Sequence, residues 1–321
     1  MKHLPFLKPL AFLLAIFPLV LSAQEPESVM VVETYSGKIL VASNATTKRP
    51  IASLTMIATG AVTVDWATAT GTDLGTVMIT APQTVAMVGG PNPMNIQPGD
   101  QLTLRDALYS ALLGSDNLAA VCIADHVGRE ILTRRSRNGD PVATFVEEMN
   151  KLAKALGMSQ TRFANPHGLE RPGTKAYSTA ADVVRLSSYA MSRNAFNFIV
   201  RQPDRQVGLV TAGGKRSFKV RNSNELVGEP GVLGVKTGLS AAAGPCVSIC
   251  MDREPLVRTK ADGNKGATPR RVIVVVLNSP ERFSRARGLI RQGWASYDPW
   301  LESGAPVHNR EREFLTMPLP Q

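Results

Sequence analysis

Three short sequence blocks, far apart along the chain, most constrain what it can fold into. The first lies in the apolar segment 51–58, which follows Pro50 and carries the hydroxyl of Ser53. Proline does not continue a preceding helix, so this segment predicts a helix that begins just after Pro50. On such a helix Ser53 and Met56 are three positions apart and share one face. The fold is therefore expected to present Ser53 at the start of a helix.

The second block is Ser115-Asp116-Asn117, between two apolar runs of helical character. A serine hydroxyl such as that of Ser53 is a poor nucleophile until a base removes its proton. A lysine one helical turn further on can be that base, but this chain has Met56 there. On a loop facing the nucleophile, Ser115 could relay a proton to a leaving nitrogen, and Asn117 could hold a substrate amide.

The third block is Lys236-Thr237-Gly238, in a segment that predicts a strand. On a strand next to a nucleophile, Lys236 lends positive charge, Thr237 can hold a substrate carboxylate, and Gly238 lets a substrate lie against the strand edge. Backbone N–H groups of this strand and of the nucleophile can together form an oxyanion hole. Each block alone is weak, because each is also typical of an ordinary helix start, capping loop or turn. Together and in this order they are much more specific.

Composition limits the alternatives. The 321 residues are 44% hydrophobic, enough for one large domain or two modest ones. The formal charge of +10 suits an anionic lipid, a cell-wall polymer or nucleic acid, but no zinc-finger or basic-helix pattern supports nucleic-acid binding. Three cysteines exclude a fully paired disulfide framework. Cys246 and Cys250 fall on one face of one predicted strand, too far apart to form a disulfide.

The first 23 residues predict a secretory signal. Lys2 and Lys8 form its positive end, an apolar run covers 9–21, and Leu21-Ser22-Ala23 is a plausible cleavage site. The apolar run is short for a membrane span, and an uncleaved anchor is the alternative. We expect the protein to act in the periplasm or cell envelope. We divide the chain into a signal peptide (1–23), one domain (24–298) and a C-terminal tail (299–321).

Periodicity and turn residues predict a mixture of helices and strands. The predicted strands lie at 29–34 and 39–42 as a hairpin, within 207–220, within 234–247 and at 272–277. The predicted helices lie at 102–127 with a break at 114–117, at 145–156, at 180–192 and at 285–297. Thr103 and Thr179 are expected to cap helices, with Asp106 and Asp182 three positions on. Short strands and loops are predicted for 61–101, and an exposed connection for 253–270.

The three blocks and the sequence around them resemble the D-alanyl-D-alanine carboxypeptidases, the low-molecular-mass penicillin-binding proteins of the S11 serine peptidase family. The resemblance runs from about residue 28 to 297. Beyond the blocks it includes the segments 52–55, 145–150, 155–158, 163–169, 177–182, 234–238 and 243–246.

This resemblance implies a β-lactamase/transpeptidase-like α/β (α+β) fold, with a five-stranded antiparallel sheet flanked by helices and a helical subdomain. It implies a peptidoglycan stem peptide ending in D-Ala-D-Ala, cleaved through an acyl-enzyme on Ser53, and β-lactams as acylating ligands. No metal and no cofactor are implied. The implied catalytic residues are Ser53, Ser115, Asn117 and Lys236, and the implied substrate-binding residues are Thr237 and Gly238.

The main departure from the family pattern is Met56, where the family has lysine. Methionine has the length of lysine but no proton-accepting amine. Loss of a positioned general base lowers the rate by about 10²–10⁴, or roughly 3–6 kcal/mol of barrier. A second departure is minor: Ser115-Asp116-Asn117-Leu118-Ala119 replaces Ser-Gly-Asn-Asp-Ala.

Several interpretations follow from Met56. Lys236 is the best substitute base, with Lys48 and His167 as weaker candidates. Arg282 or Arg285 could assist in binding a substrate carboxylate. One hypothesis is a working or weakened carboxypeptidase, and another is a pseudoenzyme that keeps the pocket for binding or regulation. A β-lactamase is disfavoured, because no Glu-x-x-Leu-Asn pattern supplies a deacylating carboxylate.

Overall fold

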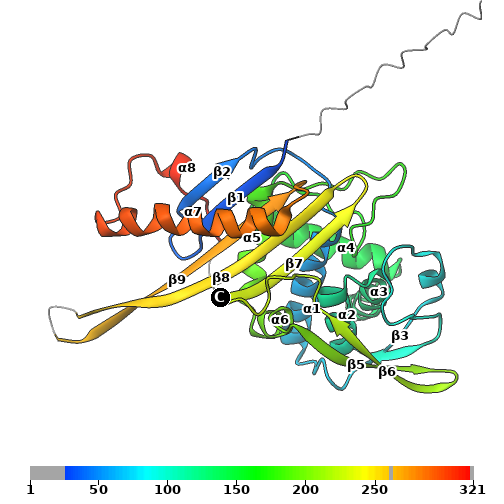
Figure 1. Ribbon diagram of the computed structural model, residues 1–321. Coiled ribbons are helices and arrows are strands. Elements are labelled where there is room, and N and C mark those ends of the chain that lie inside the picture. Colours follow the sequence, from blue (N-terminus) through cyan, green and yellow to red (C-terminus); the bar gives the residue numbers. More distant parts are fainter. Residues whose placement is uncertain (1–25, 260–262, 319–321) are drawn as a thin grey trace, which may run out of the picture.

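A five-stranded antiparallel sheet forms the centre of the fold, with strand order β2-β1-β9-β8-β7 (Figure 1). The computed structural model describes residues 26–259 and 263–318, so the predicted signal peptide lies outside the described residues. The five strands are β1 (Ser28–Glu33), β2 (Ile39–Ser43), β7 (Val232–Ser240), β8 (Gly244–Thr259) and β9 (Lys265–Leu277). This confirms the expected sheet, including the hairpin of β1 and β2.

Both faces of the sheet are buried, which explains the unbroken apolar run at the end of β9. Ile273, Val275 and Leu277 belong to one core cluster, and the alternate residues Val272 and Val274 belong to the other. This alternation follows the two-residue period of a strand. Helix α5 (Ala180–Met191) packs with the first cluster, and α7 (Arg282–Glu302) covers the opposite face.

The helical subdomain packs against the face of the sheet that carries Ile273, Val275 and Leu277. It contains α1 (Met56–Thr70), α2 (Leu104–Gly114), α3 (Asn117–Arg134), α4 (Pro141–Ala155) and α6 (Asn194–Val200). The helix caps predicted from sequence are confirmed. The Oγ1 of Thr103 accepts the N–H of Asp106 at 3.0 Å, and that of Thr179 accepts the N–H of Asp182 at 3.1 Å. These bonds satisfy amide donors that have no partner within the helix.

A smaller four-stranded sheet, in the order β3-β4-β5-β6, borders the helices. Its strands are β3 (Met78–Thr80), β4 (Gln101–Thr103), β5 (Asp204–Thr211) and β6 (Gly214–Arg221). The segment 207–220 is thus a hairpin of two strands. A short helix, η2 (Gln83–Met87), lies between β3 and β4. The cysteines Cys122, Cys246 and Cys250 are buried and free, as the strand spacing of the last two predicted.

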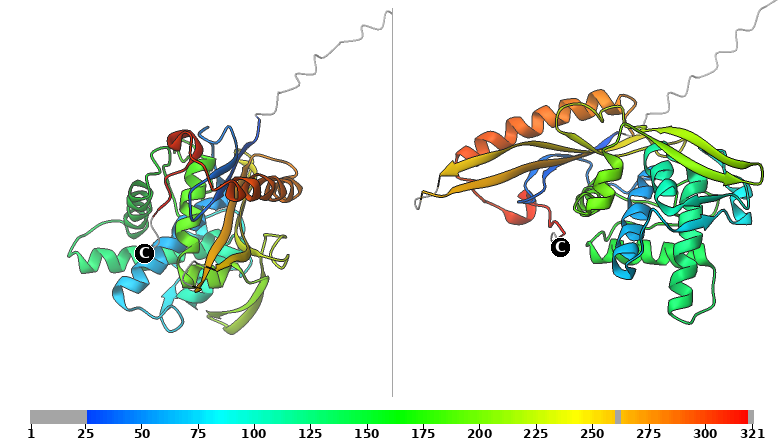
Figure 2. Two further views of the ribbon diagram at one scale, coloured as in Figure 1. Left: turned by 90° about the vertical axis from the view of Figure 1, so that its left-hand side faces the viewer. Right: turned by 90° about the horizontal axis from the view of Figure 1, so that it is seen from below.

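One sequence-based prediction is wrong, and a second is incomplete. Residues 61–70 do not form strands or loops, because α1 continues to Thr70. Burial overrides the low helix propensity of its threonines and valines, and the Thr63 hydroxyl bonds to the Thr59 carbonyl at 2.7 Å. Most of the described residues in 253–270 are exposed, as predicted, but they are not a simple connection. Residues 253–259 and 265–270 form the paired outer ends of β8 and β9, with Leu256 opposite Thr268, and these ends extend well beyond the rest of the sheet (Figure 2).

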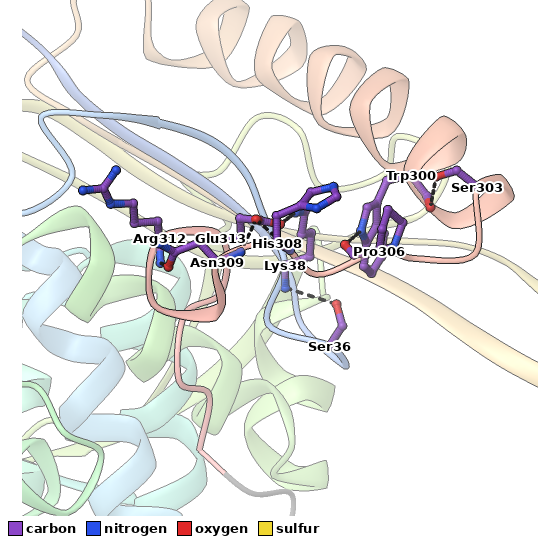
Figure 3. Close-up of polar contacts among 9 residues, drawn as sticks. All are labelled: Ser36, Lys38, Trp300, Ser303, Pro306, His308, Asn309, Arg312 and Glu313. Carbon is purple, nitrogen blue, oxygen red and sulfur yellow. Dashed lines mark hydrogen bonds and ion pairs between the residues drawn. The ribbon is translucent and has the colours of Figure 1, made fainter.

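The residues after α7 fold back onto the β1–β2 hairpin (Figure 3). Glu313, at the end of the short helix α8 (Arg310–Glu313), forms an ion pair with Lys38 at 2.7 Å and accepts the backbone N–H of Asn309 at 2.7 Å. The N–H of Leu315 then bonds to the carbonyl of Gly37 at 2.8 Å. No helix within 26–259 or 263–318 is long and apolar enough to cross a membrane.

Candidate active site

Ser53 lies on one turn of 3₁₀ helix, η1 (Ala52–Thr55), that leads directly into α1. This agrees with the helix start predicted after Pro50. Ala52 has a φ of +46°, a conformation that is strained for a residue with a side chain. Gly168, with a φ of +86°, packs so closely on this turn that an added Cβ would collide with the Ala52 carbonyl. The loop that contains Gly168 therefore fixes the backbone beside Ser53.

Ser115 and Asn117 lie at the junction of α2 and α3, and Asp116 holds this junction in shape. The Asp116 carboxylate accepts the N–H groups of Leu118 and Ala119, both at 3.0 Å, and so caps α3. Burial raises the pKa of this carboxyl, although those two hydrogen bonds oppose the rise. Ser115 is the C-cap of α2 and has a φ of +58°, a left-handed conformation that ends the helix.

Asn117 is positioned by one end of its amide and leaves the other end unused. Its Nδ2 donates to the carbonyl of Gly89 at 2.8 Å, and the side chain is buried. Within the described part of the chain, its Oδ1 has no hydrogen-bond partner. A buried amide oxygen without a partner is unfavourable, so this atom can accept an N–H group of a bound molecule.

Lys236 is almost completely buried on β7, with 1% of its surface exposed. Its Nζ donates hydrogen bonds to the Oγ of Ser115 and to the carbonyl of Thr237, the latter at 3.2 Å. Burial, and to a lesser extent the positive charge of Arg282, lowers the pKa of Lys236 to about 7. A large fraction of this amine is therefore neutral at neutral pH and can accept a proton.

A pocket of about 290 Å³ brings the three sequence blocks together. Five of the six residues singled out from the sequence line it: Ser53, Ser115, Asn117, Thr237 and Gly238. Lys236 reaches the same place through its bond to Ser115. The structure gives a further reason for Gly238, because a Cβ there would lie 2.7 Å from the carbonyl oxygen of Ile51, in the segment that leads to Ser53.

Met56 lies in the first turn of α1 with no exposed surface, and its backbone N–H bonds to the carbonyl of Ser53. It is absent from the described residues that line the pocket. His167 is also buried, and burial lowers its pKa to about 4. Its Nδ1 accepts the N–H of Leu169 at 3.1 Å, which makes it a loop-packing residue. Lys48 instead lies over the ring of Tyr177, 4.8 Å from its centre.

Of the two candidate arginines, Arg282 lines the pocket and Arg285 does not. The Arg282 guanidinium donates to the carbonyl of Gly238 at 2.8 Å. Arg285 forms an ion pair with Glu27 at 2.6 Å. The two arginines are three positions apart on α7, and their contacts show that Arg282, not Arg285, reaches the edge of β7.

Three polar residues at the pocket were missed by the sequence reasoning. The Ser223 and Thr237 hydroxyls are 2.6 Å apart, and the Ser240 hydroxyl donates to Glu170 at 2.7 Å. Ser240 lies two positions after Gly238, so the two-residue period of the strand could have indicated it. Ser223 and Glu170 are brought in by loops and carry no such signal. Among the described residues no cluster of three or more His, Cys, Asp or Glu side chains could hold a metal ion.

This fold and this arrangement of pocket residues define the transpeptidase-like class of penicillin-binding proteins. The structure is similar to the crystal structure of the Streptomyces K15 DD-transpeptidase, with a TM-score of 0.69 and 26% identity over 83% of this chain and 96% of that chain. It is also similar to penicillin-binding protein D2 of Listeria monocytogenes in its ampicillin-bound form, with a TM-score of 0.61 and 27% identity over 83% and 96% of the two chains.

Sequence comparison narrows the class to one family. The model of peptidase S11, D-alanyl-D-alanine carboxypeptidase, matches residues 21–280, and the chain belongs to this family. It is 30% identical to the D-alanyl-D-alanine carboxypeptidase DacC of Escherichia coli over 82% of this chain and 60% of DacC. It is 28% identical to DacF of Bacillus subtilis over 70% of this chain and 54% of DacF. The chain thus spans just over half the length of these two relatives.

Proposed function

We propose that this protein binds peptidoglycan stem peptides that end in D-Ala-D-Ala and acts on them as a serine carboxypeptidase with slow turnover. The observation that carries the proposal is the pocket that joins Ser53, Ser115 and Asn117 to the buried Lys236. Membership of the S11 family supports the same substrate class. The catalytic domain is residues 24–298, and the place of action is the cell envelope.

In the proposed acylation step, the Ser53 Oγ attacks the carbonyl carbon of the penultimate D-Ala. The serine proton passes through the Ser115 hydroxyl to the neutral amine of Lys236. Backbone N–H groups of Ser53 and of β7 stabilise the negative oxygen of the intermediate. When the C–N bond breaks, the proton returns through Ser115 to the nitrogen of the leaving D-Ala. Water then cleaves the ester, with its proton restored to the Ser53 Oγ.

The remaining pocket residues bind the peptide. Thr237 and the Arg282 guanidinium hold the terminal carboxylate, which is the kind of anion that arginine binds well. The unpartnered Oδ1 of Asn117 accepts a peptide N–H. Gly238 keeps the edge of β7 open for an extended peptide. A β-lactam carries a carboxylate and a reactive carbonyl in a similar arrangement, so it acylates the same serine.

The slow turnover follows from Met56. A thioether accepts no proton under these conditions, so Lys236 alone must serve both steps. We expect rates about 10²–10⁴ below those of a site with a positioned general base. The absence of Met56 from the described pocket lining, with no base in its place, also supports a second candidate function, a pseudoenzyme that binds stem peptides or regulates wall synthesis without cleaving them.

The test is the intact mass of the purified protein after incubation with benzylpenicillin, with the Ser53→Ala variant as control. A penicilloyl adduct that is absent from the control supports the enzyme. No adduct on the natural protein, with an adduct restored by Met56→Lys, supports the binding protein. An adduct that persists in Ser53→Ala contradicts both, because it would place the nucleophile elsewhere.

A further inference from the structure

A charged residue lines the pocket, and a residue of opposite charge lies next to the residues that line it. Arg282 lines the pocket beside Gly238. Glu170 directly follows Leu169, a lining residue, and its Oε1 accepts a hydrogen bond at 2.7 Å from Ser240, another lining residue. Within 26–259 and 263–318, Glu170 has no ion-pair partner, and its Oε2 has no hydrogen-bond partner. This carboxylate is therefore fixed at one oxygen and available at the other.

The hydrogen bonds of Ser240 show that Ser240 is the donor and Glu170 the acceptor. The Ser240 Oγ accepts the N–H of Ala243 at 3.0 Å, and its single proton then goes to Glu170. Glu170 is partly exposed, so its free oxygen can meet a ligand without a large desolvation penalty. The turn between β7 and β8 and the loop after Gly168 together position the carboxylate, although they are far apart in sequence.

The distance along β7 indicates which part of a peptide meets Glu170. Ser240 lies three strand positions beyond Thr237, or about 10 Å at the usual rise of an extended chain. If the terminal carboxylate of an extended peptide binds at Thr237, the last two residues of the peptide cover about 7 Å of the distance from Thr237 to Ser240. The third residue from the carboxyl end then lies beside Ser240 and Glu170. This step rests on the proposed function, which sets the direction of the peptide.

We propose that Glu170 is a specificity residue that binds a side-chain ammonium on the third residue from the carboxyl end of the peptide. The preferred substrate class is then a peptide with a basic diamino acid before D-Ala-D-Ala. Acylation of that amine removes its charge, and with it the attraction to Glu170. The pocket consequently distinguishes peptides whose side-chain amine is free from peptides whose amine is already linked to another group.

The test compares two peptides that differ only in this charge. They are Nα-acetyl-L-Lys-D-Ala-D-Ala and its Nα,Nε-diacetyl form, titrated by NMR into protein carrying Ser53→Ala so that neither is consumed. We expect the peptide with the free ammonium to bind about three- to tenfold more tightly, as for a partly exposed charged pair. The preference should shrink as salt is raised.

Variants assign the preference to Glu170. Glu170→Gln should weaken binding of the ammonium peptide alone and bring the ratio of the two Kd values to about one. Ser240→Ala, which frees the carboxylate from its hydrogen bond, should lower the ratio part of the way. The matched control is Glu147→Gln, which makes the same charge change at an exposed position of α4 and should leave the ratio unchanged.

The possible outcomes separate this inference from the proposed function. Equal binding of both peptides to the parent protein overturns the role of Glu170 and leaves the proposed function standing. A preference that survives Glu170→Gln, or that is lost equally in Glu147→Gln, also overturns it. If neither peptide binds, the proposed substrate class is wrong, and the inference that rests on it is wrong as well.

Discussion

The buried amine of Lys236 makes the rate of Ser53 acylation depend on pH in a specific way. Its pKa is lowered from the ordinary 10.5 to about 7, chiefly by burial. Only the neutral amine can accept the proton of Ser53, so the rate should rise with pH. At a pKa of about 7 the neutral fraction is about one tenth at pH 6 and about nine tenths at pH 8. The rate should therefore rise about tenfold over this range and level off above pH 8.

The assay is the rate of penicilloyl adduct formation on Ser53, followed by intact mass from pH 6 to 9 at saturating benzylpenicillin. Thermal melts at each pH confirm that the protein stays folded. Arg282 supplies a second test, because its positive charge is the second cause of the lowered pKa of Lys236. In Arg282→Gln the midpoint of the profile should move to higher pH. Each rate is extrapolated to saturation, so that weaker binding of the carboxylate does not distort the comparison.

Two results would refute this reasoning. A rate that is flat or falls between pH 6 and 8 would show that Lys236 does not accept the proton. A rate that climbs steadily to pH 9 without levelling would show that the amine keeps a pKa close to that of an exposed lysine.

Three further predictions concern Met56, His167 and Gly168. Met56→Lys should speed acylation of Ser53 at least tenfold in the same mass assay, and no gain would mean that the site has other defects. The pKa of His167 falls from 6.5 to about 4 on folding. The neutral imidazole therefore contributes on the order of 3 kcal/mol to the free energy of unfolding, present above pH 6.5 and lost as the pH falls towards 4. Urea unfolding at pH 4.5 and 7 should show a smaller pH effect in His167→Gln, and an unchanged effect would assign the titration to another group. Gly168→Ala should lower the free energy of unfolding by at least about 2 kcal/mol and slow acylation, because the Cβ of the new alanine collides with the Ala52 carbonyl. Near-normal stability and rate would contradict the close packing described for that loop.

Sequence patterns predicted those parts of the fold that local physics controls. Period-two alternation and turn residues located the β1–β2 hairpin, and hydroxyl side chains located the caps at Thr103 and Thr179. Tertiary contacts decided the region where prediction failed, 61–70, and the region where it was incomplete, 253–270. The helix that continues to Thr70 is stabilised by burial, and the outer ends of β8 and β9 are stabilised by pairing with each other. Neither effect can be seen in a short window of sequence.

The same distinction applies to the site. The three blocks indicated which residues meet in the pocket, because their chemistry requires them together. The choice between Arg282 and Arg285 could not be made, since it depends on how α7 is rotated against the sheet. Glu170 and Ser240 meet only through the tertiary fold, and no pattern links them.

The position of β1 as an interior strand of the sheet governs when the protein can fold. β1 lies between β2 and β9, so its second edge stays unpaired until the residues up to Leu277 have been synthesised. The ion pair of Lys38 with Glu313 joins residues 275 positions apart. Such non-local contacts raise the contact order, which slows folding. A ribosome-bound nascent chain that has not yet reached Leu277 therefore lacks a stable native sheet. Its apolar strands remain accessible to proteases, chaperones or the export machinery until that residue has emerged.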